Sequence, residues 1–336
     1  MRLLKPKCNK ELYCQFLIAA QTNFTATAFS EICPANIAHD SITRFLSRTK
    51  LTPSILWEYA EPLINKKAGY LVIDDSVLDH WYGKKIGLAK WQYSGTHHRV
   101  VHGIGLTNLL WTNRLPSKNA EHIPIDYRIY DPSQDGMTKN QHAREMLLLA
   151  HHRGLSPKAV IFDSWYSSLD NLKFIRALNW VFIAWVRKDR IVVPKPHVKK
   201  HIYELKIPKQ GRVIHLRGFG QVKVFKLVTK KGDIDYIVTN DFSLTPPDIE
   251  DAAARRWKVE EYHRGLKQTT GVEACQSRTP RSQRSHIFCA ILSFLALEKK
   301  RLEDGITWYE SKRRIIADAL FSYLKQPMIT LPTPGG

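Results

Sequence analysis

The order of strand-like and helix-like segments between residues 68 and 189 constrains the fold of this chain more than any other feature. Three runs with the apolar or alternating character of β-strands come first, at Tyr70–Ile73, Arg99–Leu110 and Ile123–Tyr130. Helical and strand patterns then alternate, at Lys139–His152, Ala159–Asp163, Leu169–Leu178 and Trp180–Val186. Three strands that can pair as a meander, followed by alternating helices and strands, predict an α/β domain with a mixed sheet.

This order of elements is that of a ribonuclease-H-like domain, with further segments around it. Residues 190–240 contain short strand patterns separated by Pro, Gly and Lys-Gly turns, which predicts a β-rich insertion. A strong helical pattern over Asp248–Thr269 predicts that residues 241–270 form a further helix of the core. Helical patterns in residues 1–67 and in the basic residues 271–336 predict helical N- and C-terminal regions.

One segment of the N-terminal region, Asp40–Arg48, has two different faces. Asp40 is expected to cap a helix whose outward side presents Arg44 and Arg48, where these side chains could reach DNA as part of a helix-turn-helix unit. An ordinary helical subdomain with a solvated face explains the same pattern at least as well. The residues expected to face the helical core are Ile42, Phe45 and Leu46.

The charge of the chain indicates what it binds. Lys and Arg number 51 against 31 Asp and Glu, which gives a formal net charge of +20. Such an excess favours a polyanionic partner, and the commonest polyanion is nucleic acid. The basic residues are spread along the chain, as suits a groove that follows a duplex backbone.

The cysteines and the apolar segments bear on the compartment. The five cysteines are an odd number without a Cys-x-x-Cys pair, which argues against a disulfide framework or a structural zinc site. No signal-peptide pattern follows the basic start of the chain, and the apolar stretch Ile287–Leu297 is too short to span a bilayer. We therefore expect a cytoplasmic protein that does not bind membranes.

Two aspartates follow apolar strand patterns directly: Asp74 after Tyr70–Ile73, and Asp163 after Val160–Phe162. An unpaired buried carboxylate is costly, so acids at these positions need an explanation. For either residue alone, a capped or salt-bridged structural aspartate is the better one. For both together on a basic chain, a metal site for phosphodiester chemistry is favoured, since two Mg²⁺ ions held by carboxylates can act on a phosphodiester.

A third acid lies in the later helical pattern. At about 100° per residue, Glu260 shares a narrow sector of its helix with Arg256, His263 and Lys267, whereas Glu261 points away. This face could be a metal ligand flanked by phosphate-binding groups, or a row of salt bridges on a solvated helix. Periodicity does not choose between these interpretations.

Three motifs together resemble those of bacterial insertion-sequence DDE transposases, specifically the cut-and-paste group with a β-rich insertion before the glutamate. They are Ile73–Ser76, Phe162–Tyr166 and Arg256–Glu260. The last motif of that group is Tyr, two residues, Arg, three residues, Glu, six residues and Lys. This chain matches it at Arg256, Glu260 and Lys267, but Ala253 occupies the tyrosine position.

The resemblance implies that Asp74, Asp163 and Glu260 are the catalytic residues and bind two Mg²⁺ ions, with Mn²⁺ as a substitute. Water would cut the element end, and the freed 3′-hydroxyl would attack target DNA. The implied partners are double-stranded DNA, as element ends and target, and a second copy of the chain in a homodimeric synaptic complex. The DNA contacts are assigned to Arg256, His263, Lys267, Arg44 and Arg48.

Several alternatives stay open. Asp75 competes with Asp74 as the first ligand, because neighbouring residues alternate across a strand and both faces of the sheet can be covered. Trp165 and Tyr166 are candidates for stacking on an unpaired base, whereas Trp185 is expected in the core. A nuclease of the same fold that cuts without joining is one rival function. A catalytically inactive, transposase-derived DNA-binding protein is the other.

Overall fold

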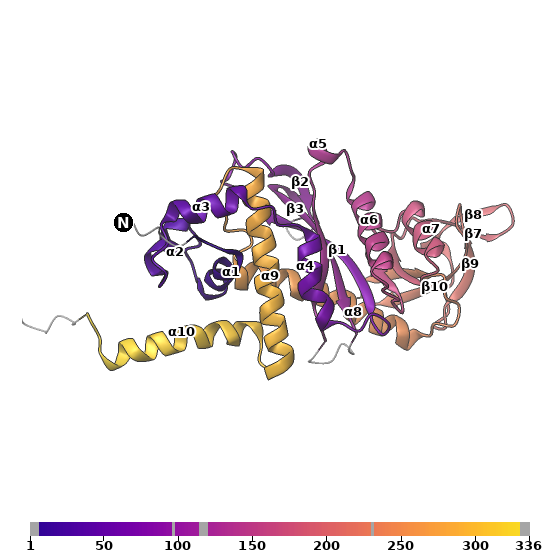
Figure 1. Ribbon diagram of the computed structural model, residues 1–336. Helices are drawn as coiled ribbons and strands as arrows, with labels where there is room; N and C mark the ends of the chain where they lie inside the picture. The colour runs from indigo at the N-terminus through magenta and orange to yellow at the C-terminus, as the bar shows by residue number, and fades with distance from the viewer. Residues whose placement is uncertain (1–6, 96–97, 114–119, 230–231, 330–336) are drawn as a thin grey trace, which may run out of the picture. The chain divides into compact units, whose positions relative to one another are not determined.

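A computed structural model describes residues 7–95, 98–113, 120–229 and 232–329 (Figure 1). The chain divides into two compact units. One consists of residues 51–264 and 278–280, and we call it the sheet unit. The other consists of residues 1–50, 265–277 and 281–336, and we call it the helical unit.

The sheet unit is built on one mixed sheet. In the described part of the chain its strand order is β2-β3-β1-β5-β6-β11-β10-β9-β7-β8, with β4 paired to β3. The pairs β1–β5 and β5–β6 are parallel, and the other pairs are antiparallel. The strands are β1 (Tyr70–Asp79), β2 (Lys90–Ser94), β3 (Arg99–Thr112), β4 (Ile123–Ile129), β5 (Val160–Phe162), β6 (Phe182–Val186), β7 (Ile191–Lys195), β8 (Val198–His201), β9 (Arg212–Leu216), β10 (Gly220–Val228) and β11 (Ile234–Thr239).

The strand β1 is longer than the sequence predicts. The prediction ended the strand at Ile73, but β1 continues to Asp79, so Asp74 and Asp75 lie inside the strand. The reason is the long partner β3, which pairs with β1 through Asp79. Close approach at this end requires glycine, because a Cβ atom on Gly103 would lie 2.4 Å from the carbonyl oxygen of Leu78.

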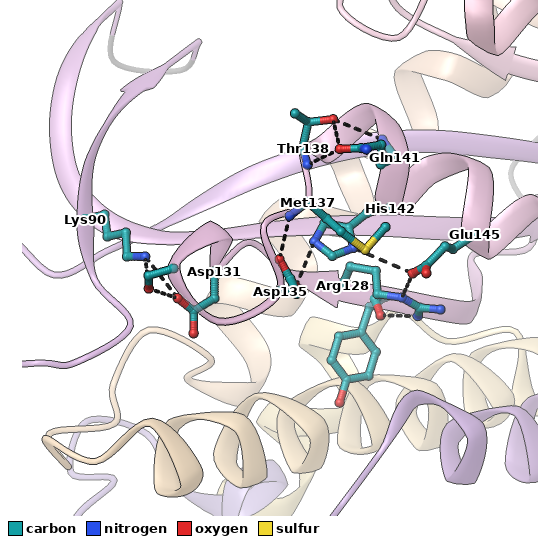
Figure 2. Close-up of polar contacts among 11 residues, drawn as sticks. Lys90, Arg128, Asp131, Asp135, Met137, Thr138, Gln141, His142 and Glu145 are labelled. Atoms are coloured by element: carbon teal, nitrogen blue, oxygen red, sulfur yellow. Dashed lines mark hydrogen bonds and ion pairs between the residues drawn. The ribbon is translucent and has the colours of Figure 1, made fainter.

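The helices of the sheet unit cover the sheet and fix its connections. Helix α4 packs against β4, α6 packs against β3, β4 and α7, and α7 packs against β6. Figure 1 shows α6 and α7 beside each other. A capping box between Thr138 and Gln141 sets the first turn of α6 (Figure 2). These elements are α4 (Pro53–Ala60), η1 (Glu61–Leu63), α5 (Pro132–Asp135), α6 (Lys139–His152), α7 (Leu169–Ala177), η2 (Ile202–Glu204) and most of α8 (Pro246–Thr270).

The helical unit has an aromatic and aliphatic core. The rings of Phe16 and Phe29 stack with centroids 4.4 Å apart, and the hydroxyl of Tyr13 lies 2.9 Å from Nδ1 of His286. Among the described residues, no helix is long and apolar enough to cross a membrane. The helices of the helical unit are α1 (Lys10–Ala19), α2 (Ala26–Ile32), α3 (His39–Arg48), α9 (Pro280–Asp304, from its second residue), α10 (Trp308–Lys325) and the end of α8.

The helix α3 agrees with most of its prediction. Its apolar residues are buried, and Arg44 and Arg48 are exposed. The predicted N-cap is wrong: the helix begins one residue earlier, Ala38 is the N-cap residue, and Asp40 lies in the first turn. A carboxylate in that turn is still favourable, because it faces the positive end of the helix dipole.

Candidate active site

Asp74 and Asp75 are neighbours on β1 but have different surroundings. Oδ2 of Asp74 lies 3.6 Å from Nε2 of His263 on α8. The carboxylate of Asp75 accepts a hydrogen bond from Nζ of Lys139 at 2.5 Å and another from the hydroxyl of Tyr166 at 3.0 Å. Asp74 therefore faces α8, whereas Asp75 is bonded to α6 and to the loop after β5.

Asp75 accepts hydrogen bonds from Lys139 and Tyr166, and the sequence motifs do not predict these contacts. Lys139 is the first residue of α6, next to the capping box of Thr138 and Gln141 (Figure 2), and its ion pair with Asp75 holds its amine in place. Tyr166 is buried, and its hydroxyl also lies 3.4 Å from the Thr107 hydroxyl. Tyr166 is therefore a core residue, whereas the side chain of Trp165 is 61% exposed.

Asp163 directly follows β5, and its carboxylate organises the loop that comes next. Oδ1 accepts hydrogen bonds from the backbone N–H groups of Trp165, at 3.0 Å, and Tyr166, at 3.4 Å. Burial, followed by the negative charges of Asp74 and Asp75, raises the pKa of Asp163 to about 6, and the positive charge of Arg256 acts in the opposite direction. The raised pKa of Asp163 thus reflects burial first and repulsion by the neighbouring carboxylates second.

Glu260 belongs to the same electrostatic group. Burial raises its pKa, and the charge of Asp74 raises it further, while Arg256 and His263 lower it. Glu261 is directed elsewhere: its carboxylate accepts a hydrogen bond from Nζ of Lys258 at 2.7 Å. The helical-face argument for Glu260 over Glu261 agrees with these contacts.

Two further residues of α8 lie beside the acids. The guanidinium of Arg256 lies 5.1 Å from the ring of the buried Trp185, and within the described residues its Nε has no hydrogen-bond partner. The ring of His263 is buried next to Asp74, and its nitrogens likewise lack hydrogen bonds in this part of the chain. The preceding residue, Tyr262, donates a hydrogen bond to Asn108 on β3 at 3.2 Å, which fastens α8 to the sheet.

Three residues predicted to bind DNA belong to the helical unit. Lys267 forms an ion pair with Glu273 at 2.8 Å, and Arg44 and Arg48 lie on α3. Ala253, in place of the expected tyrosine, lies within the sheet-unit part of α8. The structure thus brings Asp74, Asp163, Glu260, Arg256 and His263 together in one unit, and the roles of all these residues stay predictions.

A protein-family model described as "Transposase DDE domain" matches residues 77–295, which is more than half of the chain. The chain belongs to this transposase DDE domain family. This confirms the family that the sequence motifs indicate. No curated protein matches the chain.

The match to the DDE transposase family covers two of the three predicted catalytic acids. It begins at Val77, just after Asp74 and Asp75, and it includes Asp163 and Glu260. The assignment of the first acid therefore depends on the contacts along β1 rather than on the family match.

DDE transposases generally use divalent metal ions, and the acids of this transposase fit such ions in chemistry. Carboxylate oxygens are the hard ligands that Mg²⁺ prefers, and a cation would relieve the mutual repulsion that raises the pKa of Asp163. Within the described ranges, however, no three His, Cys, Asp or Glu side chains are grouped closely enough to hold an ion. The acids therefore match a divalent ion in ligand type and charge, but their side chains are not already arranged around one ion position.

Proposed function

We propose that the chain is a DNA transposase that cleaves the ends of an insertion sequence and joins the 3′-hydroxyl to target DNA. The proposal includes a ribonuclease-H-like core, whose expected order of three strands followed by alternating helices and strands agrees with β1 to β6, apart from the additional strand β2 and the short helix α5. The observation that carries it is the electrostatic coupling of Asp74, Asp163 and Glu260 in a member of the DDE family.

Asp74, rather than Asp75, is the proposed first ligand. Asp75 already accepts hydrogen bonds from Lys139 and Tyr166, which use its oxygens and partly neutralise its charge. Asp74 faces α8, which carries Glu260, and its charge raises the pKa of both Asp163 and Glu260. Asp75 then has a positioning role, because it anchors β1 to α6 next to the reacting acids.

Asp74, Asp163 and Glu260 would hold the Mg²⁺ ions, for which Mn²⁺ could substitute. Bound divalent ions supply activation of the attacking oxygen and stabilisation of the leaving oxygen. Arg256 is suited to bind a phosphate near the scissile bond, because its guanidinium lies against Trp185 and its Nε has no hydrogen-bond partner among the described residues. His263 orients the Asp74 carboxylate from the buried side.

The remaining contacts of the proposal concern DNA outside the reacting bond. Lys267, Arg44 and Arg48 are proposed to bind the backbone of double-stranded element ends or target DNA. Two chains would pair two ends, so a homodimer is the proposed working form. The cytoplasm is the proposed place of action. The net charge of +20 supports a partner with many phosphates.

A strand-transfer assay tests this function. Labelled duplexes carrying the sequences that flank the gene are incubated with target DNA, Mg²⁺ and protein. Joined products support transposition, cleaved but unjoined ends support a nuclease, and bound but intact DNA supports an inactive binding protein. Glu260→Gln should abolish joining, whereas Glu261→Gln, its neighbour on another face of α8, should retain it. Joining that survives Glu260→Gln would refute the assigned role of Glu260.

A further inference from the structure

Four exposed aromatic side chains gather at one edge of the sheet, which β3 separates from the acid-bearing strand β1. They lie in the loop after β1 and on β2, the edge strand that pairs only with β3 among the described strands. We call them the aromatic edge: Trp81 (43% exposed), Tyr82 (95%), Trp91 (63%) and Tyr93 (60%). Large apolar side chains exposed singly are common, but several gathered in one patch mark a surface that interacts with a partner.

The two faces of β2 make different contacts. Trp91 and Tyr93 lie on one face, opposite His102 and Val100 of β3. On the other face, Nζ of Lys90 donates a hydrogen bond to Asp131 at 2.9 Å (Figure 2). The inward-facing side is thus occupied by polar contacts, so the aromatic side is held outward.

Two rings of the aromatic edge, those of Trp81 and Trp91, are held by neighbouring side chains. The ring centroids of Trp81 and Trp91 lie 6.0 Å apart in an edge-to-face arrangement, and Trp91 lies 5.3 Å from the buried ring of His102. The guanidinium of Arg99 lies over Trp81 at 5.2 Å. These contacts restrict the rings, so a flat ligand would bind to a surface that is already ordered.

The charge around these rings is mainly positive. The exposed Lys84 and Lys85 follow Tyr82 closely in the chain, Arg99 lies over Trp81, and no Asp or Glu occurs between Asp79 and Glu121, although the Asp79 carboxylate accepts a hydrogen bond from the backbone N–H of Trp81 at 2.9 Å. Exposed aromatic rings interleaved with cations are typical of surfaces that bind unpaired nucleotides, because bases stack on the rings and phosphates contact the cations.

We propose that the aromatic edge binds single-stranded DNA, with bases stacked on Trp91 and Tyr93 and phosphates held by Lys84, Lys85 and Arg99. Residues two apart on a strand are separated by about 6.8 Å. Stacked bases of a duplex follow one another at about 3.4 Å along each strand. The spacing of the Trp91 and Tyr93 rings on β2 therefore matches the unstacked bases of a single strand, and not the stacked bases of a duplex.

This inference deepens the proposed function by naming a second form of its DNA substrate, and it rests on that function for the choice of DNA. The test avoids the chemistry altogether. Full-length protein is titrated in EDTA against a fluorescein-labelled oligothymidylate and, separately, against a labelled duplex, with fluorescence anisotropy as the readout. Failure of strand transfer would leave this measurement intact.

Trp91→Ala with Tyr93→Ala should weaken oligothymidylate binding by about tenfold or more, with a smaller effect on duplex binding. Trp91→Phe with Tyr93→Phe should retain most of the affinity, because the rings remain. Phe242→Ala removes another exposed ring (44%) outside the aromatic edge and should change nothing. Lys84→Ala with Lys85→Ala should lower the salt dependence, by a slope of about 0.7 for each phosphate that the variant no longer neutralises.

Three outcomes would overturn the proposal. The first is equal loss of duplex and oligothymidylate affinity in the Trp91 and Tyr93 alanine variant. The second is unchanged oligothymidylate binding. The third is a change from dimer to monomer in sedimentation without a change in DNA binding, which would make the aromatic edge a contact between copies of the chain. If the alanine variant fails to fold, loss of binding in the phenylalanine variant also counts against the proposal.

Discussion

Two aspartates of the sheet unit, Asp126, which is buried, and Asp163, which is half-buried, show the difference between a carboxylate that supports the fold and one that is suited to bind an ion. Asp126 on β4 is fully buried, forms an ion pair with Arg128 and lies 3.6 Å from the guanidinium of Arg153. The charged neighbours of Asp163 are Asp74 and Asp75, which raise its pKa, and Arg256, which lowers it. Burial raises the pKa of both, but cations oppose the shift at Asp126 while anions add to it at Asp163. The fold neutralises the first site and leaves the second with excess negative charge.

The largest expected effect is the loss of strand transfer when Asp163 is changed. Asp163→Asn should reduce strand transfer in Mg²⁺ by about 100-fold or more, because a two-ion mechanism depends on each carboxylate ligand. Single-turnover joining of labelled DNA measures this. Asp170→Asn changes an exposed acid on α7 and serves as the control. Near-normal joining by Asp163→Asn would remove Asp163 from the site.

Asp126→Asn should destabilise the sheet unit by about 3 kcal/mol, because it removes a buried counter-charge from the partly buried Arg128 and Arg153 and leaves Arg128 paired with Glu145 at 3.8 Å. Urea unfolding followed by circular dichroism measures the loss. An unchanged urea midpoint would mean that water solvates these two arginines sufficiently, and that their pairing with Asp126 does not stabilise the fold.

Asp163→Asn should act on stability in the opposite direction. In metal-free buffer at pH 7 we expect a gain of about 1–3 kcal/mol, because the variant removes a repelled charge. The folded pKa of about 6 exceeds the ordinary value of 3.8, so folded protein binds more protons between these values, and wild-type stability falls as pH rises through this window. The gain should therefore be complete above about pH 6 and vanish below about pH 3.8.

The comparison sharpens when Mg²⁺ is added to the same unfolding experiment. The ion should stabilise the wild type and have little effect on Asp163→Asn, since a ligand that binds only the folded state raises its stability. Stabilisation of both proteins to the same degree would place the ion elsewhere.

The smallest expected effect concerns the second layer around the acids. Lys139→Met should lower joining by about tenfold with little change in DNA affinity, because it removes the ion pair that holds Asp75 but leaves the three ligands. Single-turnover rates and anisotropy separate the two effects. Lys173→Met, at an exposed position of α7, is the matched control. Equal loss in rate and affinity would indicate instead that Lys139 contacts DNA.

The sequence predicts most of the sheet unit because its strands are apolar and its helices periodic. The predicted bounds of α6 agree with the structure, and β3, β4 and β6 differ by a few residues. The sequence does not predict β2, since its outward side is aromatic and its inward side carries Lys90 and Gln92, the reverse of the usual pattern. It also does not predict the extent of β1, because this depends on pairing with β3 and not on local propensity.

The candidate site divides in the same way. The helical period separates Glu260 from Glu261, and the contacts of the two agree. The difference between Asp74 and Asp75 could not come from the sequence, because it depends on Lys139 and Tyr166, which are distant along the chain. The Thr138–Gln141 capping box was a usable signal for the first turn of α6, although it does not reveal what Lys139 contacts.

The pairing of β6 with β11 has a consequence for shortening this protein. Both ends of the segment between them are tied together, since Asn240 accepts a hydrogen bond from the N–H of Phe182 and donates one to the carbonyl of Trp180. Removing residues 190–240 would uncover the edge of β6 that pairs with β11, from Ile183 to Val186, and a bare strand edge recruits other chains. Removing only the hairpin of β7 and β8 leaves this edge of β6 covered and uncovers the shorter stretch of β9 that pairs with β7, so the shorter deletion should carry the smaller risk of aggregation.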